Sequence, residues 1–313
     1  MDVRLSPEQR ALQDSVRQVV RNLAPTAVGQ LDDVERAAKL DAAVDAAGWR
    51  ELRTASDDGT PWASAVEAAI VAEELSRGLA DAAFLGPTLA AELRRLAGAP
   101  AAGGRETVVL ESVAVDAAGA TSALVLDGLA LGVVALDDAR VTVDLTRPVA
   151  TPRSAPEVIG TIGEDDLARW TALVLALTSA ELVGSTQGAV QLATDYARER
   201  RQYGQPIGSF QAVQHLLADA HVATEGSRSV ALHAAWAVDA LPPDEALAAA
   251  AVAKAYCSRA ARAVCEASIQ VHGGIGNTWE CLAHVHLRRA LLSTDIGGGV
   301  GPSLETVVAH ALR

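Results

Sequence analysis

Residues 196–214 read YARERRQYGQPIGSFQAVQ. The charged helix end Arg198–Arg201 is followed directly by Tyr203-Gly204-Gln205-Pro206, and glycine and proline in such a cluster end a helix. A second helix is expected to begin after Gly208-Ser209. The stretch therefore predicts a sharp turn between two helices, with the guanidinium of Arg200 beside the turn.

The sequence on both sides of this turn is typical of long helices. Leucine and valine recur at helical spacing from Glu164 up to the turn, and an alanine-rich helix is expected over Glu245–Val271. Residues 269–280 read IQVHGGIGNTWE, and their glycines end that helix. One more helix is expected over Thr278–Leu292, before a glycine-rich turn at Gly297–Gly301. Such alanine- and leucine-rich segments are typical of a helical bundle.

The N-terminal part also favours helices. Ser6 as N-cap, Pro7 at the first helical position and Gln9 three residues after the cap form a capping-box pattern. Further helices are expected over Val34–Ala47, Ser64–Arg77 and Pro87–Leu96.

The chain changes character between Gly103 and Gly163. Short β-branched runs separated by Asp-Gly, Asp-Asp and Pro predict a small antiparallel sheet. The expected strands include Thr107–Leu110, Ala123–Leu126, Leu131–Leu136 and Val141–Val143. The fold class predicted from the residues is therefore mainly α with a small β domain.

Composition excludes several classes of function. A formal charge of −13 over 313 residues argues against a nucleic-acid partner, because such affinity depends on clustered lysine and arginine. No run of eighteen apolar residues suggests a membrane span, and the N-terminus lacks the pattern of a signal peptide, so a cytoplasmic location is expected. Three cysteines without metal-ligand spacing favour small buried hydrophobic residues over a metal site.

The two quoted stretches, in this order, resemble the signatures of acyl-CoA dehydrogenases. That resemblance implies an N-terminal helical domain (residues 1–103), a reduced middle β domain (104–162) and a C-terminal four-helix bundle (163–313). It also implies a flavoenzyme that desaturates an acyl-CoA thioester. In the family a glutamate removes the α proton, the β hydrogen leaves as hydride to FAD, and the electrons pass to an electron-transfer flavoprotein.

The resemblance also assigns residues to the ADP side of FAD. Arg200 matches a pyrophosphate-binding arginine, and Gln211 matches a glutamine near the adenine half. In homotetrameric members these groups reach across to the neighbouring subunit's FAD. The residues alone leave plainer interpretations open, such as a solvated helix end or a glycine helix cap. The full set of expected FAD contacts is Arg200, Tyr203, Gln211, Gln270, Val271, His272, Gly273 and Gly274.

The sequence departs from the family's pattern at the flavin ring and at the base. The Thr-Glu-Pro loop that embraces the ring is absent, and only the segment Asp144–Pro148 of the middle domain resembles bacterial relatives. Gly297 occupies the position of the catalytic glutamate, and Val174 occupies the helix position that some relatives use instead. Glu181 and Asp295 are the remaining candidates for a relocated base.

These matches and departures favour a subunit of a heteromer. The resemblance extends to α2β2 heterotetramers of actinobacterial steroid catabolism, in which a paralogous full-length subunit supplies the flavin-ring pocket and the base. A sterol-derived acyl-CoA is then the implied substrate, and the isolated chain is expected to be inactive. Two alternatives stay open: a self-sufficient homomeric dehydrogenase that uses Glu181 or Asp295, and a non-enzymatic scaffold subunit with the same fold.

Overall fold

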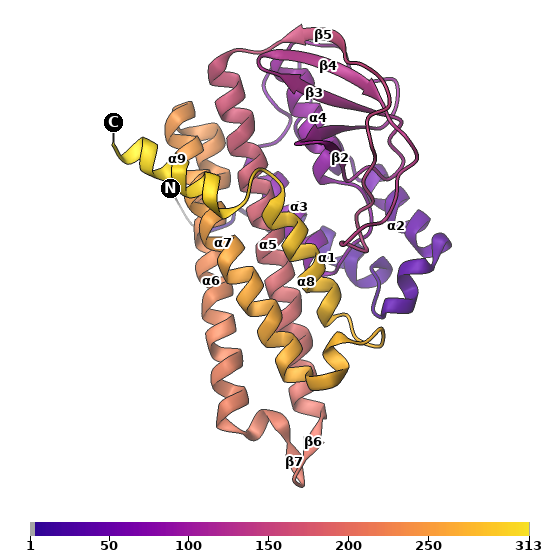
Figure 1. The fold of residues 1–313 in the computed structure, drawn as a ribbon, viewed down its shortest axis with the longest axis vertical. Helices are drawn as coiled ribbons and strands as arrows, with labels where there is room; N and C mark the ends of the chain where they lie inside the picture. The colour runs from indigo at the N-terminus through magenta and orange to yellow at the C-terminus, as the bar shows by residue number, and fades with distance from the viewer. Residues whose placement is uncertain (1–3, 313) are drawn as a thin grey trace.

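Helices make up most of the structure, a computed structural model that describes residues 4–312 (Figure 1). The fold class predicted from the sequence, mainly α with a small sheet, is confirmed. The N-terminal part contains α1 (Pro7–Leu23), η1 (Val28–Asp32), α2 (Val34–Ala46), η2 (Trp49–Glu51), α3 (Ala65–Arg77) and α4 (Leu85–Leu96).

The predicted capping box begins α1. The backbone N–H of Gln9 donates to Ser6 Oγ at 3.2 Å, and the backbone N–H of Ser6 donates to Gln9 Oε1 at 3.0 Å. Two backbone donors that the first turn leaves free are satisfied in this way. Helix α3 begins with a second box, formed by Ser64 and Glu67.

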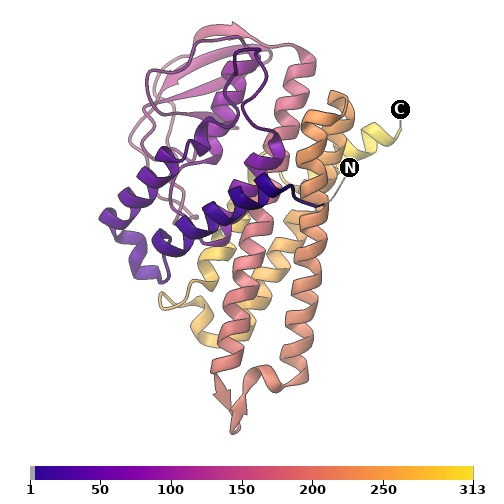
Figure 2. The same cartoon turned by 180° about the vertical axis from the view of Figure 1, so that it is seen from behind.

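Helix α3 lies directly on the long helix α5 (Glu164–Glu199), and Figure 2 shows the N-terminal helices crossing the bundle from behind. Small residues allow the close approach. A Cβ atom added to Gly184 would lie 2.1 Å from the carbonyl oxygen of Glu73, so no larger residue fits there without displacing backbone.

The sheet has five strands in the order β2-β1-β3-β4-β5. It covers α4, which packs against β1, and it lies at one end of the molecule (Figure 1). The strands are β1 (Glu106–Leu110), β2 (Val113–Val115), β3 (Ser122–Asp127), β4 (Ala130–Ala135) and β5 (Glu157–Thr161).

The sheet differs from the predicted antiparallel one in two ways. Strands β1 and β3 pair in parallel, because the chain returns after β2 to the end at which β1 began. Asp116 stands at the start of that return, and its Oδ2 accepts the backbone N–H of Phe84 at 2.6 Å. The expected strand Val141–Val143 is absent, since Val141 and Val143 are more than half exposed and no apolar layer covers them.

The C-terminal half is a bundle built on α5, α6 (Gln211–Ala240), α7 (Pro243–His272) and α8 (Ala283–Asp295). The predicted turn after α5 is a hairpin of β6 (Arg201–Gln202) and β7 (Gln205–Pro206), followed by η3 (Ile207–Ser209). The last predicted helix begins at Ala283 instead of Thr278, because η4 (Gly273–Asn277) and a turn precede it. Helix α9 (Val300–Ala311), which the sequence analysis did not predict, follows the glycine-rich turn.

Helix α5 is long and apolar enough to cross a membrane by length and composition alone, yet 78% of its most apolar window is buried inside the protein. That burial is what the core helix of a bundle shows, since α3, α6, α7 and α8 all pack against α5. The three-domain division expected at residues 103 and 162 stays a prediction, although the strands of the sheet lie between Glu106 and Thr161.

Candidate functional site

The segments that carry the expected FAD contacts lie together at the end of the bundle away from the sheet: the end of α5, the β6–β7 hairpin, the start of α6 and the end of α7 (Figure 1). Arg200 caps the C-terminus of α5, Gln211 begins α6, and Gln270 lies in the last turn of α7. An apolar cluster that contains Ala193, Ala197 and Val271 joins these segments. Sequence positions far apart are thus brought to one end, as the resemblance requires. The role of each residue stays a prediction.

The hairpin side of this end carries an unpaired cation. Among the described residues, the exposed side chain of Arg200 has no hydrogen-bond or ion-pair partner. Tyr203 is 94% exposed at the hairpin tip, where its φ of 52° turns the chain, and its ring meets Phe210 edge-on at 6.3 Å. A free guanidinium beside the uncapped N-terminus of α6 is suited to an anionic group such as a pyrophosphate.

At the end of α7, the side chain of His272 is held by contacts within the chain. The ring of His272 is buried, stacks on Tyr196 at 4.5 Å, and has Nδ1 2.7 Å from the carbonyl oxygen of Ser268. These contacts give His272 a packing role at the helix end. Gly273 and Gly274 are exposed, and an added Cβ on either would meet no atom within 4 Å. Their backbone is therefore open to a ligand or a partner chain.

The two positions at which the resemblance leads us to expect a catalytic base, Gly297 and Val174, lie close together in space. A Cβ atom added to Gly297 would lie 3.0 Å from Leu175 Cδ2 and 3.4 Å from Val174 Cγ1. One position comes from the loop after α8 and the other from α5, and neither carries a carboxylate. Val174, Leu175 and Ile296 are buried in the main apolar core, so this chain's own side chains fill the place.

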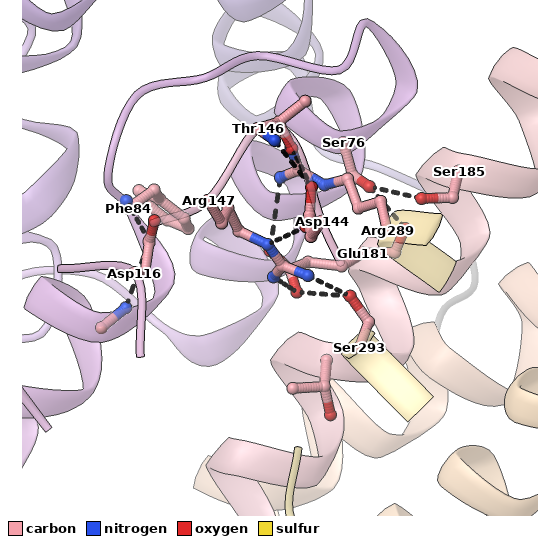
Figure 3. Close-up of polar contacts among 12 residues, drawn as sticks. Ser76, Phe84, Asp116, Asp144, Thr146, Arg147, Glu181, Ser185, Arg289 and Ser293 are labelled. Atoms are coloured by element: carbon pink, nitrogen blue, oxygen red, sulfur yellow. Dashed lines mark hydrogen bonds and ion pairs between the residues drawn. The ribbon is translucent and has the colours of Figure 1, made fainter. Parts of the chain in front are cut away.

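Glu181 lies in α5 with both carboxylate oxygens bound by arginine (Figure 3). Its Oε2 accepts Arg147 Nη1 at 2.6 Å and the hydroxyl of Ser293 at 3.2 Å. Its Oε1 lies 3.5 Å from Arg289 Nη2. A carboxylate that is 2% exposed and held by two guanidiniums is poorly placed to accept a substrate proton.

The other proposed acid, Asp295, is exposed at the end of α8, where its carbonyl oxygen accepts the backbone N–H of Gly298 at 2.9 Å. No contact of its side chain directs the carboxylate toward the place shared by Gly297 and Val174 among the described residues. Of the three described pockets, none is lined by Val174, Leu175 or Gly297, and the 630 Å³ one lies instead beside α4 and the start of β1.

Sequence reasoning missed Lys254, which is fully buried in α7. Its Nζ donates to Thr178 Oγ1 at 3.0 Å and to the carbonyl oxygen of Ser293. Burial lowers the pKa of Lys254 to about 7, against the opposing pull of the Glu181 carboxylate. A lone lysine on the interior face of an alanine-rich helix was the signal available in the sequence.

Comparisons with known proteins agree with the resemblance drawn from the two signatures. The model of the acyl-CoA dehydrogenase N-terminal domain matches residues 6–99, and that of the acyl-CoA dehydrogenase C-terminal domain matches residues 175–312. Neither match includes any strand of the five-stranded sheet.

Among curated proteins, acyl-CoA dehydrogenase IpdE2 of Mycobacterium tuberculosis is 35% identical over 237 residues, which cover 72% of this chain and 71% of IpdE2. IpdE2 of Mycolicibacterium smegmatis is 35% identical over 52% of this chain and 48% of its own length. FadE34 of Mycobacterium tuberculosis is 40% identical over 53% of this chain, but the match covers only 22% of FadE34.

Solved structures share the fold over nearly the whole chain. A chain of the Tcur3481–Tcur3483 steroid ACAD superposes with a TM-score of 0.85 at 22% identity, covering 97% of this chain and 98% of that chain. A chain of the ChsE4–ChsE5 complex of Mycobacterium tuberculosis gives 0.78 at 22% identity, covering 100% and 99%.

Proposed function

The chain belongs to the acyl-CoA dehydrogenase family, and from that premise we propose that it is the base-lacking subunit of a heteromeric, FAD-dependent acyl-CoA dehydrogenase. It would offer the ADP-side contacts of FAD across the interface to a paralogous full-length subunit, which supplies the flavin-ring pocket and the glutamate. The enzyme would act in the cytoplasm and pass its electrons to an electron-transfer flavoprotein.

The observation that carries this proposal is the convergence of Gly297 and Val174. The two positions that the resemblance assigns to a base lie against each other, neither carries a carboxylate, and buried apolar side chains fill the space between them. At the other end of α5, six of the candidate FAD contacts are exposed (Arg200, Tyr203, Gln211, Gln270, Gly273 and Gly274), whereas Val271 and His272 are buried. In this proposal the chain's own core closes one half of the site, and the exposed half contacts FAD held by a partner.

The length of α5 supports contact across an interface. A helix rises 1.5 Å per residue, so Val174 and Arg200 are separated by roughly 40 Å along α5. That separation exceeds the length of an extended FAD molecule. Arg200 is therefore too far away to bind the pyrophosphate of a flavin whose ring lies beside Val174 of the same chain, which supports a proposal in which Arg200 contacts the FAD of a second subunit.

The substrate class rests on the relatives. The Tcur3481–Tcur3483 structure is described as a steroid ACAD, and ChsE4–ChsE5 is a complex of two proteins. These names favour a paired-subunit enzyme that acts on a bulky, sterol-derived acyl-CoA. FAD would supply the hydride-accepting chemistry, while Arg200 and Gln211 of this chain would hold its phosphate and adenine side.

The test is to purify the chain alone and together with a co-expressed paralogue that carries an intact flavin loop and glutamate. We expect the chain alone to be colourless and inactive toward acyl-CoA with an artificial electron acceptor, and the complex to be yellow and active. A yellow, active homomer without any partner would contradict the proposal and favour a relocated base. A complex whose FAD content is unaffected by Arg200→Ala would favour the scaffold role.

A further inference from the structure

Six ionisable side chains are buried together where the sheet, the N-terminal helices and the bundle meet. All of them except Lys254 are labelled in Figure 3. Three are cationic and three are anionic, so the cluster is neutral when all are charged. Its members come from segments far apart in the chain: Asp116, Asp144, Arg147, Glu181, Lys254 and Arg289. Arg147 is the central one, because it contacts partners on both the loop and the bundle.

Arg147 belongs to the segment Asp144–Pro148, the one part of the middle domain that resembled bacterial relatives. Its Nε donates to Asp144 Oδ2 at 2.8 Å within the same loop. Its Nη1 and Nη2 reach into the bundle, to Glu181 Oε2 at 2.6 Å and to Ser293 Oγ at 2.7 Å. The side chain is 2% exposed, so these bonds are shielded from water.

Ser293 is held from three sides. Its hydroxyl accepts from Arg147 and donates to Glu181, and its carbonyl oxygen accepts from Lys254. Ser293 lies in the last turn of α8, immediately before the glycine loop Gly297–Gly299. The three glycines have φ values of +81°, +93° and +75°, and they carry no side chain of their own to hold the loop.

We propose that Arg147 is a positioning residue that fixes the last turn of α8 through Ser293, and thereby holds the glycine loop at the place where relatives carry the catalytic glutamate. The loop sits against Leu175 and Val174, and its other end is tied by Ser303 Oγ, which donates to the carbonyl oxygen of Gly299 at 2.7 Å. The middle domain thus sets the geometry of the bundle's closed site. Any effect on FAD in the heteromer rests on the proposed function; the order of the loop does not.

Hydrogen–deuterium exchange of the chain alone, without FAD, tests the loop independently of the proposed function. In Arg147→Met/Glu181→Gln the cluster keeps two cations and two anions, and the amide introduced at position 181 retains an acceptor for Ser293. Global stability falls because Asp144 loses its Arg147 partner, and exchange then speeds throughout the chain. We expect exchange over residues 294–300 to speed at least about tenfold more than over the rest of the chain, because a charge-assisted bond to Ser293 is lost. Ser293→Ala should loosen the same residues without changing the charge balance.

Two matched control variants distinguish a specific effect on the glycine loop from a general loss of stability of the chain. Arg53→Met removes a buried cation from the N-terminal helices, and Ser268→Ala removes a buried hydroxyl that donates to the carbonyl oxygen of Ala189 at 2.9 Å. Neither should speed exchange at residues 294–300 beyond its effect on the rest of the chain. The proposal is overturned if the controls loosen the loop equally, or if Ser293→Ala leaves its exchange unchanged.

Discussion

Gly297 combines a left-handed backbone with a close apolar contact. Its φ is +81°, and an added Cβ would meet Leu175 Cδ2 at 3.0 Å. We expect Gly297→Glu to lower the free energy of unfolding by about 1–3 kcal/mol, because an L side chain is strained at that φ. It should give no acyl-CoA dehydrogenation in the chain alone, since the new carboxylate would face packed side chains. Urea unfolding and dye reduction with acyl-CoA measure the two effects.

Gly301→Glu, just beyond the glycine loop in α9, is the matched control. A Cβ at Gly301 meets no atom within 4 Å, and an acidic residue in the first turn of α9 is favoured by the helix dipole. Its stability should be unchanged or slightly higher. Measurable turnover by the Gly297→Glu chain would show that the site is not closed.

Lys254 is expected to make stability depend on pH. Its pKa is about 7 in the folded chain, against an ordinary value of 10.5. Between these values the unfolded chain holds a proton that the folded chain has lost, so the free energy of unfolding should rise as the pH increases above about 7. The slope contributed by this one group is at most about 1.4 kcal/mol per pH unit.

Urea unfolding between about pH 7 and 8 measures that slope, because most cysteine thiols of the unfolded chain are still protonated in this range. Lys254→Met should remove the rise. Lys39→Met, at an exposed lysine paired with Glu35, should keep it. Parallel pH curves for the unsubstituted chain and Lys254→Met would mean that Lys254 stays charged or finds other partners.

The cofactor contacts are expected on three neighbouring segments: the β6–β7 hairpin, the end of α5 and the end of α7. If Arg200 grips the pyrophosphate of a flavin held by the partner, Arg200→Ala should weaken FAD binding by the complex roughly ten- to a hundredfold, the loss of one charge-assisted bond. Assembly should persist, because one exposed arginine contributes little to a large apolar interface. Titration of the apo-complex with FAD, followed by flavin absorbance, measures the change.

Arg201 provides the control for this prediction. It is the next residue, also exposed, and its side chain has no hydrogen-bond or ion-pair partner within residues 4–312. Arg201→Ala should leave FAD affinity near that of the unsubstituted complex. Equal losses of FAD affinity in both variants would indicate a general electrostatic effect of the hairpin. No loss in either variant would mean that Arg200 is a solvated residue at a helix end and does not bind FAD.

Helices could be predicted at the element scale because their signals are local. Ser6, Pro7 and Gln9 determine where α1 begins, and the predicted break at 203–206 is the hairpin. The sheet could not be predicted to the same depth. The parallel pairing of β1 with β3 depends on where the chain returns after β2, and the start of that return is tied to Phe84 by Asp116. Such a long-range bond leaves no periodic pattern in the sequence.

At the scale of the whole molecule, contacts between distant segments also limit how much of the candidate site can be predicted from the sequence. The two signatures predicted which residues gather at the end of the bundle, and the structure brings them together. The sequence could not show that Glu181 is held by Arg147 and Arg289, because those arginines lie in segments that only the tertiary fold brings together. From the sequence alone Glu181 is therefore a candidate base, and only its two arginine partners in the fold argue against that role.

A buried arginine also joins the N-terminal helices to the bundle through ion pairs. Arg53, fully buried after η2, donates to Glu92 Oε1 in α4 at 2.9 Å and to Asp239 Oδ1 near the end of α6 at 3.0 Å. Arg53→Met leaves Glu92 with Arg95 alone and leaves Asp239 bound only to the backbone N–H of Ala65 at 2.6 Å. Because the buried carboxylate of Glu92 loses one of its two cations, we expect the free energy of unfolding to fall by about 1–3 kcal/mol. Arg262→Met, which breaks the exposed Arg262–Glu266 pair on α7, should change the free energy of unfolding little.

Urea unfolding followed by circular dichroism and by tryptophan fluorescence measures the stability of both variants. Similar losses in the two would contradict a special contribution of the buried pair, and separate transitions by the two probes in Arg53→Met would show that this pair keeps the N-terminal helices and the bundle unfolding as one unit.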